Sequence, residues 1–420
     1  MSKIFRSVIL LYLALLATFT TLMIVVHMIP RSAIQKNFIK SVELFEQEGD
    51  YFYLPTFYGS IFMDNFSDCY MHNVAYCVDT SHPVDAAMCN YRYRDNTKMV
   101  VSMRHLTDGQ LIAKPFEYGK YWHGYLVTLR PLLTIMDYRS IRKLNGIVLA
   151  LLVTCALVLM WRKLSPAIAI CFVVAMVMVH SVVIPWSLQY STCYYITLTS
   201  IILLLKFNRF TSSWRYQLMS FFAIGAFTSF LDFLTTPIMT LGVPLTVVLL
   251  NDKTNYQTKL IVGLTLAWGT GYICMWMSKW MLAILLTGYN PLSEVTEHIH
   301  LHSVGNTTES VWTMWGKLND IILTLWTPLS SSGLIRWSII VAMMGLAIIA
   351  PCSRTVIKHH IGLLMVAAIT PIWYILVIHH SYTHFPISHR ALLVSWFAIL
   401  CFMCQIIDFK KLKYYGSNLM

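Results

Sequence analysis

The stretch VILLYLALLATFTTLMIVVHMI, residues 8–29, contains no charged side chain. A helix needs about 20 apolar residues to cross the hydrocarbon core of a bilayer, so this stretch predicts a membrane-spanning helix. No small-residue cleavage site closes it before Pro30 and Arg31, which argues against a removable signal peptide. Of the 420 residues, 57% are hydrophobic and 12% are charged, whereas soluble proteins are about 25% charged. This composition excludes a disordered chain, a nucleic-acid-binding domain and an ordinary soluble enzyme.

Nine further apolar stretches predict spans. They lie at 145–161, 166–186, 190–206, 216–233, 236–251, 259–287, 334–350, 360–378 and 391–407. We therefore expect an all-α polytopic membrane protein with about ten transmembrane helices, forming a single membrane domain over residues 1–420. Membrane lipid is then the partner that surrounds most of the chain.

Basic residues cluster at alternate ends of these spans. They are Lys3, Arg6, Arg162, Lys163, Lys206, Arg209, Arg215, Lys253, Lys259, Arg354, Lys358, Lys410, Lys411 and Lys413. Short cytoplasmic segments carry the excess of Lys and Arg, so both termini are predicted to be cytoplasmic in a multi-pass protein of the cell membrane. Two outer segments, 30–144 and 288–333, are too long to be simple links and are expected to carry function on the extracytoplasmic side.

The first outer segment contains DNFSD, residues 64–68. Asp64 and Asp68 are four residues apart and would share one face of a helix. If that helix lies along the membrane surface, both acids point at the mouth of the bundle, where one can act as a general base while the other tunes it. The alternative is that Asp64 caps a helix and Asp68 is solvated.

Further along the same segment is YWHGYLVTLRP, residues 121–131. Aromatic and apolar residues alternate there with His123 and an arginine, which predicts an amphipathic helix in the headgroup layer. His123 is either a structural anchor or a contact to substrate. Cys69, Cys77 and Cys89 also lie in this segment, and their number allows one disulfide.

Three ionisable residues lie at the outer ends of predicted spans, where such residues usually mark function. They are Asp232 in FLDFL, Lys279 in WMSKW, and Arg390, which precedes the last span. The two cations are surrounded by aromatic residues and suit a lipid phosphate. The alternatives are that Lys279 reaches to the interface and that Asp232 forms a buried salt bridge to one of the cations.

Four histidines occur in HHSYTHFPISHR, residues 379–390. His380 and His384 have the spacing of a metal pair on a helix. However, a proline interrupts the pattern and HExxH is absent, so no metal site is assigned and a divalent metal is not expected. We expect these residues to bind a phosphate or a sugar hydroxyl instead, with His389 and Arg390 as the best pair.

At these residues the chain resembles the GT-C superfamily of membrane glycosyltransferases. The matching elements are residues 64–68, Trp122–Tyr125, Phe230–Leu234, Trp276–Trp280 and Ser381–Arg390, in this order along the chain. They are scattered over most of the sequence. The chain departs from well-known members because it lacks an adjacent Asp-Glu pair and a large C-terminal domain outside the membrane.

The resemblance implies transfer of a monosaccharide from a polyprenyl-phosphate donor to a cell-envelope glycopolymer, such as a teichoic acid, a capsule or a wall polysaccharide, with inversion at the anomeric carbon. It implies that Asp64 or Asp68 is the base, and that Lys279, Arg390 and His389 hold the donor phosphate. Residues that bind the acceptor or the sugar would be Asp232, His384, His380, His123 and Tyr382. No cofactor is implied besides the lipid-linked sugar. A cytoplasmic glycosyltransferase that makes the donor and a flippase that delivers it would be partners.

Two alternatives remain open at this point. An O-antigen-type polymerase or ligase also has a long outer loop, but it uses late arginines and a histidine instead of early acids. A lipid-linked sugar flippase or transporter would need ionisable residues along a path through both leaflets. Here these residues cluster on the outer side, which favours an enzyme.

Overall fold

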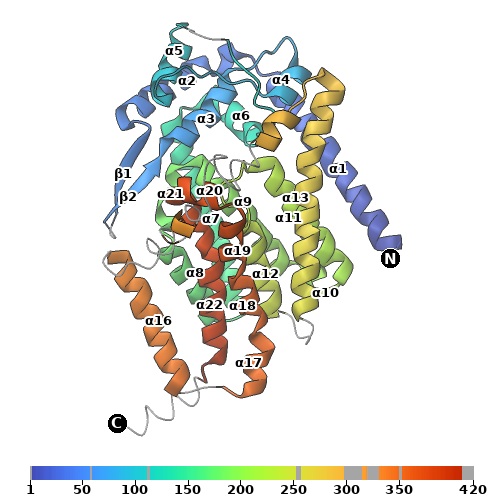
Figure 1. Cartoon of the computed structure of the whole chain (residues 1–420), viewed down its shortest axis with the longest axis vertical. Coiled ribbons are helices and arrows are strands. Elements are labelled where there is room, and N and C mark those ends of the chain that lie inside the picture. Colours follow the sequence, from blue (N-terminus) through green and yellow to red (C-terminus); the bar gives the residue numbers. More distant parts are fainter. Residues whose placement is uncertain are drawn as a thin grey trace.

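The computed structural model describes residues 2–56, 59–110, 114–251, 257–297, 315–317, 319, 331–349 and 352–408. It is a helical bundle with a cap of shorter helices over one end, and a hairpin extends from the cap along the side of the bundle (Figure 1). The cap is formed by the segment between the first and second long helices, and the described C-terminal residues lie at the opposite end. Most of the second predicted outer segment, 288–333, lies outside the described residues.

The cap contains five helices and the protein's two strands, within the part of the chain described. These are α2 (Arg31–Glu48), β1 (Tyr51–Thr56), β2 (Gly59–Asp64), α3 (Asn65–Tyr76), α4 (Pro83–Cys89), α5 (Met99–Thr107) and α6 (Leu126–Ile135). The strands pair antiparallel, with Tyr51 opposite Asp64 and Thr56 opposite Gly59.

The bundle is formed by the remaining helices. These are α1 (Ser2–His27), α7 (Tyr138–Lys163), α8 (Pro166–Met178), η1 (Ser181–Trp186), α9 (Leu188–Lys206), α10 (Arg209–Ser212), α11 (Trp214–Leu231), α12 (Met239–Asn251), α13 (Gln257–Thr287), α16 (Ser331–Ile349), α17 (Arg354–His360), α18 (Gly362–Ala367), α19 (Ile369–Leu376), α20 (Ile378–Thr383), α21 (Phe385–Ser388), η2 (His389–Leu392) and α22 (Leu393–Ile406).

Six helical segments among the described residues are long and apolar enough to cross a membrane. They are Lys3–His27, Tyr138–Lys163, Leu188–Lys206, Gln257–Thr287, Arg354–Leu376 and His389–Ile406. The prediction of an all-α, multi-pass membrane protein is therefore confirmed at this level. All ten predicted stretches contain helix, but the count of ten spans stays a prediction.

The other four predicted spans are shorter than expected or fall outside these six. Helices α8 and α12 have 13 residues each, which corresponds to about 20 Å of helix, less than the roughly 30 Å of a bilayer core. Helix α8 stops because His180 adopts a left-handed conformation and a 3-10 turn containing Pro185 follows. Helix α12 is nearly enclosed by its neighbours and forms part of the bundle core.

The predicted amphipathic helix at 121–131 is wrong in its extent. The helix begins at Leu126, and Trp122 and Arg130 are fully buried. The Arg130 guanidinium donates to three backbone carbonyls, those of Val26, Ile29 and Ala75. A cation is favourable next to carbonyls at helix C-terminal ends. This segment therefore joins the end of α1 to the end of α3 inside the cap. Its place in the headgroup layer stays a prediction.

The cysteines of the cap are all free and buried. Cys69 lies within α3, Cys77 follows the last residue of α3, and Cys89 ends α4. The Cys89 sulfur instead approaches Asp85 and Thr287. The disulfide that the sequence allowed is not formed.

Helices α11 and α13 approach each other closely through small residues. A Cβ at Gly271 would overlap the carbonyl of Phe222, and a Cβ at Gly225 would overlap the carbonyl of Trp268. Small residues at helix contacts are the usual means of close packing in membranes, where apolar burial alone does not drive association.

We predict that Gly271→Ala lowers the melting temperature of the purified protein, because the added methyl forces α11 and α13 apart at a cost of about 1–3 kcal/mol. Gly269→Ala is the matched control on the same helix, since nothing lies within 4 Å of a Cβ at that position. It should be neutral, or stabilising by up to about 1 kcal/mol. Equal melting temperatures for the two variants would contradict the close contact.

Candidate functional site

The β1–β2 hairpin brings the first acid into position. Side chains alternate between the two faces of a strand, and the pairing of Tyr51 with Asp64 and of Tyr53 with Phe62 places these four side chains on one face. The opposite face, with Phe52, Leu54, Ile61 and Met63, contacts the hydrophobic core of the bundle. The hairpin therefore turns Asp64 away from the core.

Asp64 is the N-cap of α3. Its carboxylate accepts hydrogen bonds from Ser67 N at 3.1 Å and from Ser67 Oγ at 2.8 Å, as expected for a capping aspartate. The residue is only 5% exposed. Burial raises the pKa of Asp64 above its ordinary value, although the Ser67 hydrogen bonds and the charge of Arg390 act in the opposite direction.

Asp68 lies behind Asp64 and is completely buried. It accepts hydrogen bonds from the Tyr138 hydroxyl on α7, from Ser187 Oγ at 3.2 Å and from Gln189 N at 3.1 Å at the start of α9. Burial raises the pKa of Asp68 to about 6, opposed mainly by the hydrogen bond from Tyr138. The carboxylate thus ties α3 to α7 and α9. It is neither solvated nor directed at the mouth of the bundle.

A cavity of about 260 Å³ lies between the cap and the bundle. It is lined by Tyr51, Asp64, Phe66, Ser67, Tyr70, Arg94, Tyr118, Tyr121, Gln189, Phe233, Leu234, Thr235, His380, His384 and Ile387. Four regions that are distant in the sequence meet here: the cap, the start of α9, the turn before α12 and the segment α20–α21. The cavity therefore brings together Asp64, His380 and His384 of the residues predicted from the sequence.

Arg390 is not among the residues that line this cavity; it lies at the start of the last long helical segment, three residues after the cavity residue Ile387. It is almost fully buried, and its guanidinium carbon lies 4.0 Å from the centroid of the Tyr190 ring. Its charge lowers the pKa of Asp64, as noted above, so the two side chains are electrostatic neighbours. The neighbouring His389 ring lies 6.0 Å from that of His180.

Asp232 and Tyr382 flank the cavity without lining it. One Asp232 oxygen accepts the backbone N–H of Thr235 at 2.9 Å, which closes the turn that carries Phe233 and Leu234 into the cavity wall. Tyr382 is 42% exposed, and the Lys317 ammonium lies 5.7 Å from its ring.

Lys279 is not among the residues that line the cavity. It is fully buried on α13, and its ammonium donates to Ala87 O at 2.6 Å and to Asn90 Oδ1 at 3.1 Å. Carbonyl groups at the end of α4 therefore hold this cation, and it fastens α4 to α13. The Lys279 ammonium is thus engaged by groups of α4. This does not fit the expectation that Lys279 and Arg390 hold one phosphate between them.

His123 is also part of the framework. Its Nδ1 lies 2.9 Å from the Tyr125 hydroxyl and its Nε2 lies 3.0 Å from Tyr118 O. A neutral imidazole satisfies both contacts if Nε2 donates and Nδ1 accepts. Burial lowers the pKa of His123 to about 3. This fits the structural role and not the substrate contact.

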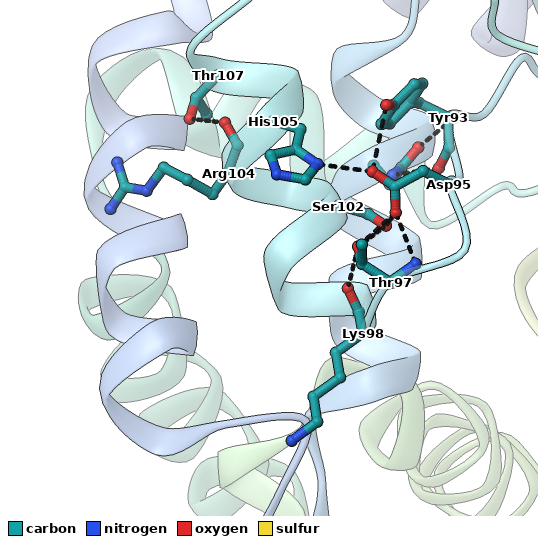
Figure 2. Close-up of polar contacts among 9 residues, drawn as sticks. Tyr93, Asp95, Thr97, Lys98, Ser102, Arg104, His105 and Thr107 are labelled. Carbon is teal, nitrogen blue, oxygen red and sulfur yellow. Dashed lines mark hydrogen bonds and ion pairs between the residues drawn. The ribbon is translucent and has the colours of Figure 1, made fainter. Parts of the chain in front are cut away.

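Several cavity residues were not found by sequence reasoning. Arg94 belongs to an Arg-Tyr-Arg segment that Asp95 holds in place. Asp95 accepts hydrogen bonds from Ser102 Oγ at 2.5 Å, His105 Nδ1 at 2.7 Å and the Thr97 hydroxyl (Figure 2). This network fastens the segment with Arg94 to α5.

Gln189 is another missed residue. It is buried, lines the cavity, and has no hydrogen-bond partner for its side-chain oxygen within the described part of the chain. A buried acceptor normally finds a partner, so a donor from a ligand, such as a sugar hydroxyl, would complete it.

Two apolar grooves reach the region of the cavity from the bundle surface. One, of about 570 Å³, lies between α1, α9 and α11; the other, of about 380 Å³, lies between α6, α7 and α9. They share Tyr195 and Leu231. The second includes Leu188, the neighbour of the cavity residue Gln189. The two grooves therefore adjoin each other, and the second reaches the residue before Gln189 on α9.

No group of three or more His, Cys, Asp or Glu side chains suited to a metal ion occurs among the described residues. No family model, curated protein or solved structure matches the chain. The site must therefore be interpreted from its own geometry.

We predict that acid destabilises the protein partly through His123. The folded imidazole resists protonation, whereas in the unfolded chain it takes up a proton below about pH 6.5. Stability is therefore unaffected at higher pH and falls as the pH drops below that value, by up to about 1.4 kcal/mol per pH unit for this group. Melting temperatures of the wild type and of His123→Gln between pH 7.5 and 4.5 test this. The melting temperature of the variant should fall less than that of the wild type as the pH is lowered. If the two melting temperatures fall in parallel, His123 is not a buried neutral imidazole.

Proposed function

We propose that the protein is an integral-membrane glycosyltransferase that moves a monosaccharide from a polyprenyl phosphate to an acceptor hydroxyl. The observation that carries this proposal is the position of the Asp64 carboxylate in a cavity with aromatic walls, next to the Arg390 guanidinium and to apolar grooves. Such a reaction needs a base for the acceptor hydroxyl and a cation for the phosphate. It also needs a space for the sugar and an apolar surface for the polyprenyl chain.

The chemistry follows from these parts. Asp64 takes the proton of the acceptor hydroxyl while the oxygen of that hydroxyl attacks the anomeric carbon of the donor sugar. The bond from that carbon to the phosphate oxygen breaks, and the polyprenyl phosphate leaves with the electron pair, which inverts the anomeric centre. A raised pKa makes Asp64 a stronger base than an ordinary aspartate. Arg390 would stabilise the charge that develops on the leaving phosphate.

The apolar grooves support a lipid-linked donor over a soluble nucleotide sugar. The larger groove is lined almost entirely by aliphatic and aromatic side chains of α1, α9 and α11, including Leu11, Leu203 and Phe227. An isoprenoid chain can lie there while its phosphate reaches Arg390. We place the reaction on the extracytoplasmic side with both termini cytoplasmic, and a separate synthase and flippase would supply the donor.

The roles of the two acids and two predicted cations differ in this account. Asp64 and Arg390 take part in the reaction, with His380, His384 and Gln189 as contacts to the sugar. Asp68 and Lys279 are positioning residues, since each is held by hydrogen bonds to protein groups and neither lines the cavity.

We predict that Asp64→Asn lowers sugar transfer at least 1,000-fold at unchanged melting temperature, because the amide cannot accept the proton. In Asp68→Asn we expect a lower melting temperature but a turnover per folded molecule within about tenfold of the wild type. The assay uses purified protein in nanodiscs, a radiolabelled polyprenyl-phosphate hexose and envelope polymer from a strain lacking this protein. Full activity of Asp64→Asn would exclude Asp64 as the base.

The pH profile of transfer gives a second prediction. Activity should fall on the acid side as Asp64 becomes protonated, at a pH above the ordinary range of an aspartate. Since the charge of Arg390 lowers the pKa of Asp64, Arg390→Gln should move this acid limb to higher pH, besides reducing turnover. Arg139→Gln is a control, because this residue is exposed on α7 and contacts Gln47 instead. An unmoved acid limb in Arg390→Gln would show that the two groups do not interact.

A further inference from the structure

The hairpin presents an exposed row of aromatic rings beside the cavity. Tyr51 and Tyr53 are 54% and 66% exposed. The Phe62 ring lies between them, with centroids 5.4 Å from Tyr51 and 5.7 Å from Tyr53. We call these three side chains the aromatic face of the hairpin. Large exposed aromatics in one patch usually mark a binding surface.

The row continues into the cavity. Tyr51 lies 6.3 Å from Phe66, and Phe66 lies 5.2 Å from Tyr70, measured between ring centroids. Tyr51, Phe66 and Tyr70 all line the cavity. The aromatic face is thus the outer part of one surface whose inner part is the wall around Asp64.

Strand pairing aligns this surface with the candidate base. Asp64 is paired with Tyr51, and Phe62 with Tyr53, so the carboxylate stands in the same row as the exposed rings. Residues on one face of a strand repeat roughly every 7 Å, about the scale of one pyranose ring. If an extended ligand lies along the aromatic face, one of its ends therefore comes close to Asp64.

We propose that the aromatic face binds the acceptor as an extended carbohydrate chain of several sugar units, with the terminal hydroxyl at Asp64. The inference rests on the proposed function for the reaction but not for the binding itself. Pyranose rings present C–H groups that are attracted to the negative faces of aromatic rings. The tyrosine hydroxyls add hydrogen bonds at the edges.

The composition of this face favours a carbohydrate over acyl chains. The same face of the hairpin also includes Ser60, which is paired with Pro55. The Asp64 carboxylate lies at the end of this face that is next to the cavity. Ionised carboxylates are costly in hydrocarbon. The apolar side of the hairpin, with Leu54 and Ile61, is already covered by the bundle.

The binding test needs no donor and no turnover. Protein in nanodiscs is titrated with maltohexaose, cellohexaose, chitohexaose and α-1,6-mannohexaose and with the corresponding monosaccharides, and binding is followed by saturation-transfer NMR and calorimetry. We expect at least one hexaose to bind more than tenfold tighter than its monosaccharide. Tyr53→Ala combined with Phe62→Ala should weaken this binding at least tenfold.

Phe207→Ala is the matched control, since this exposed aromatic lies at the far end of α9; it should bind like the wild type. Absence of hexaose binding, or equal binding by the double variant at unchanged melting temperature, would overturn the proposal. Glycan binding without any sugar transfer would leave this inference standing and refute the proposed function.

A crosslinking experiment separates glycan from lipid. The photoreactive residue p-benzoylphenylalanine replaces Tyr53 in nanodiscs that also contain the best-binding hexaose carrying a fluorophore. The proposal expects a fluorescent adduct that excess unlabelled hexaose competes away. Adducts to phospholipid alone would show that the face contacts the membrane and would overturn it.

Discussion

The buried carboxylate of Asp68 holds the cap on the bundle. It receives hydrogen bonds from Tyr138 on α7 and from Ser187 and Gln189 at the start of α9, so one side chain of the cap joins two bundle helices. Hydrogen bonds to a charged group contribute about 1.5–3 kcal/mol each, and removing one partner leaves a buried polar group unsatisfied. This constraint sets the position of α3 and therefore of the residue that caps it.

A second clamp lies one turn further along α7. Arg142 donates to both carboxylate oxygens of Glu48 at 2.8 and 2.9 Å and to Asn65 Oδ1 at 2.8 Å. Asn65 in turn donates to Glu48 and to Gly49 O. The end of α2, the start of α3 and α7 are thus fixed together on both sides of Asp64. Such a preorganised framework is what a general base needs, because a misplaced proton acceptor loses much of its effect.

The helices were predictable from the sequence because long apolar runs are a local signal, and all ten stretches contain helix. The hairpin was missed, although alternating residues such as Tyr51 and Tyr53 favour strands. The predicted helix at 121–131 begins later than expected, and the burial of its arginine could not be predicted because its partners are backbone carbonyls that only the fold brings near. The same reason explains Lys279, whose partners on α4 are about 190 residues away in the chain.

The candidate site was predictable only in part. Asp64, His380, His384 and Arg390 were named from the chemistry of their side chains, but their grouping depends on long-range packing. Gln189 carries no local signal of its role, since it is one polar residue at the start of an apolar helix. Which of two nearby acids faces the cavity is decided by the cap geometry of α3, not by their spacing.

The most direct test of the central claim is a cryo-EM structure in nanodiscs with a non-transferable polyprenyl-phosphonate sugar. The account predicts that the sugar lies in the cavity beside Asp64, with the phosphonate at Arg390 and the isoprenoid chain along α1, α9 and α11. Analogue density at any other place, with the cavity unfilled, would contradict it.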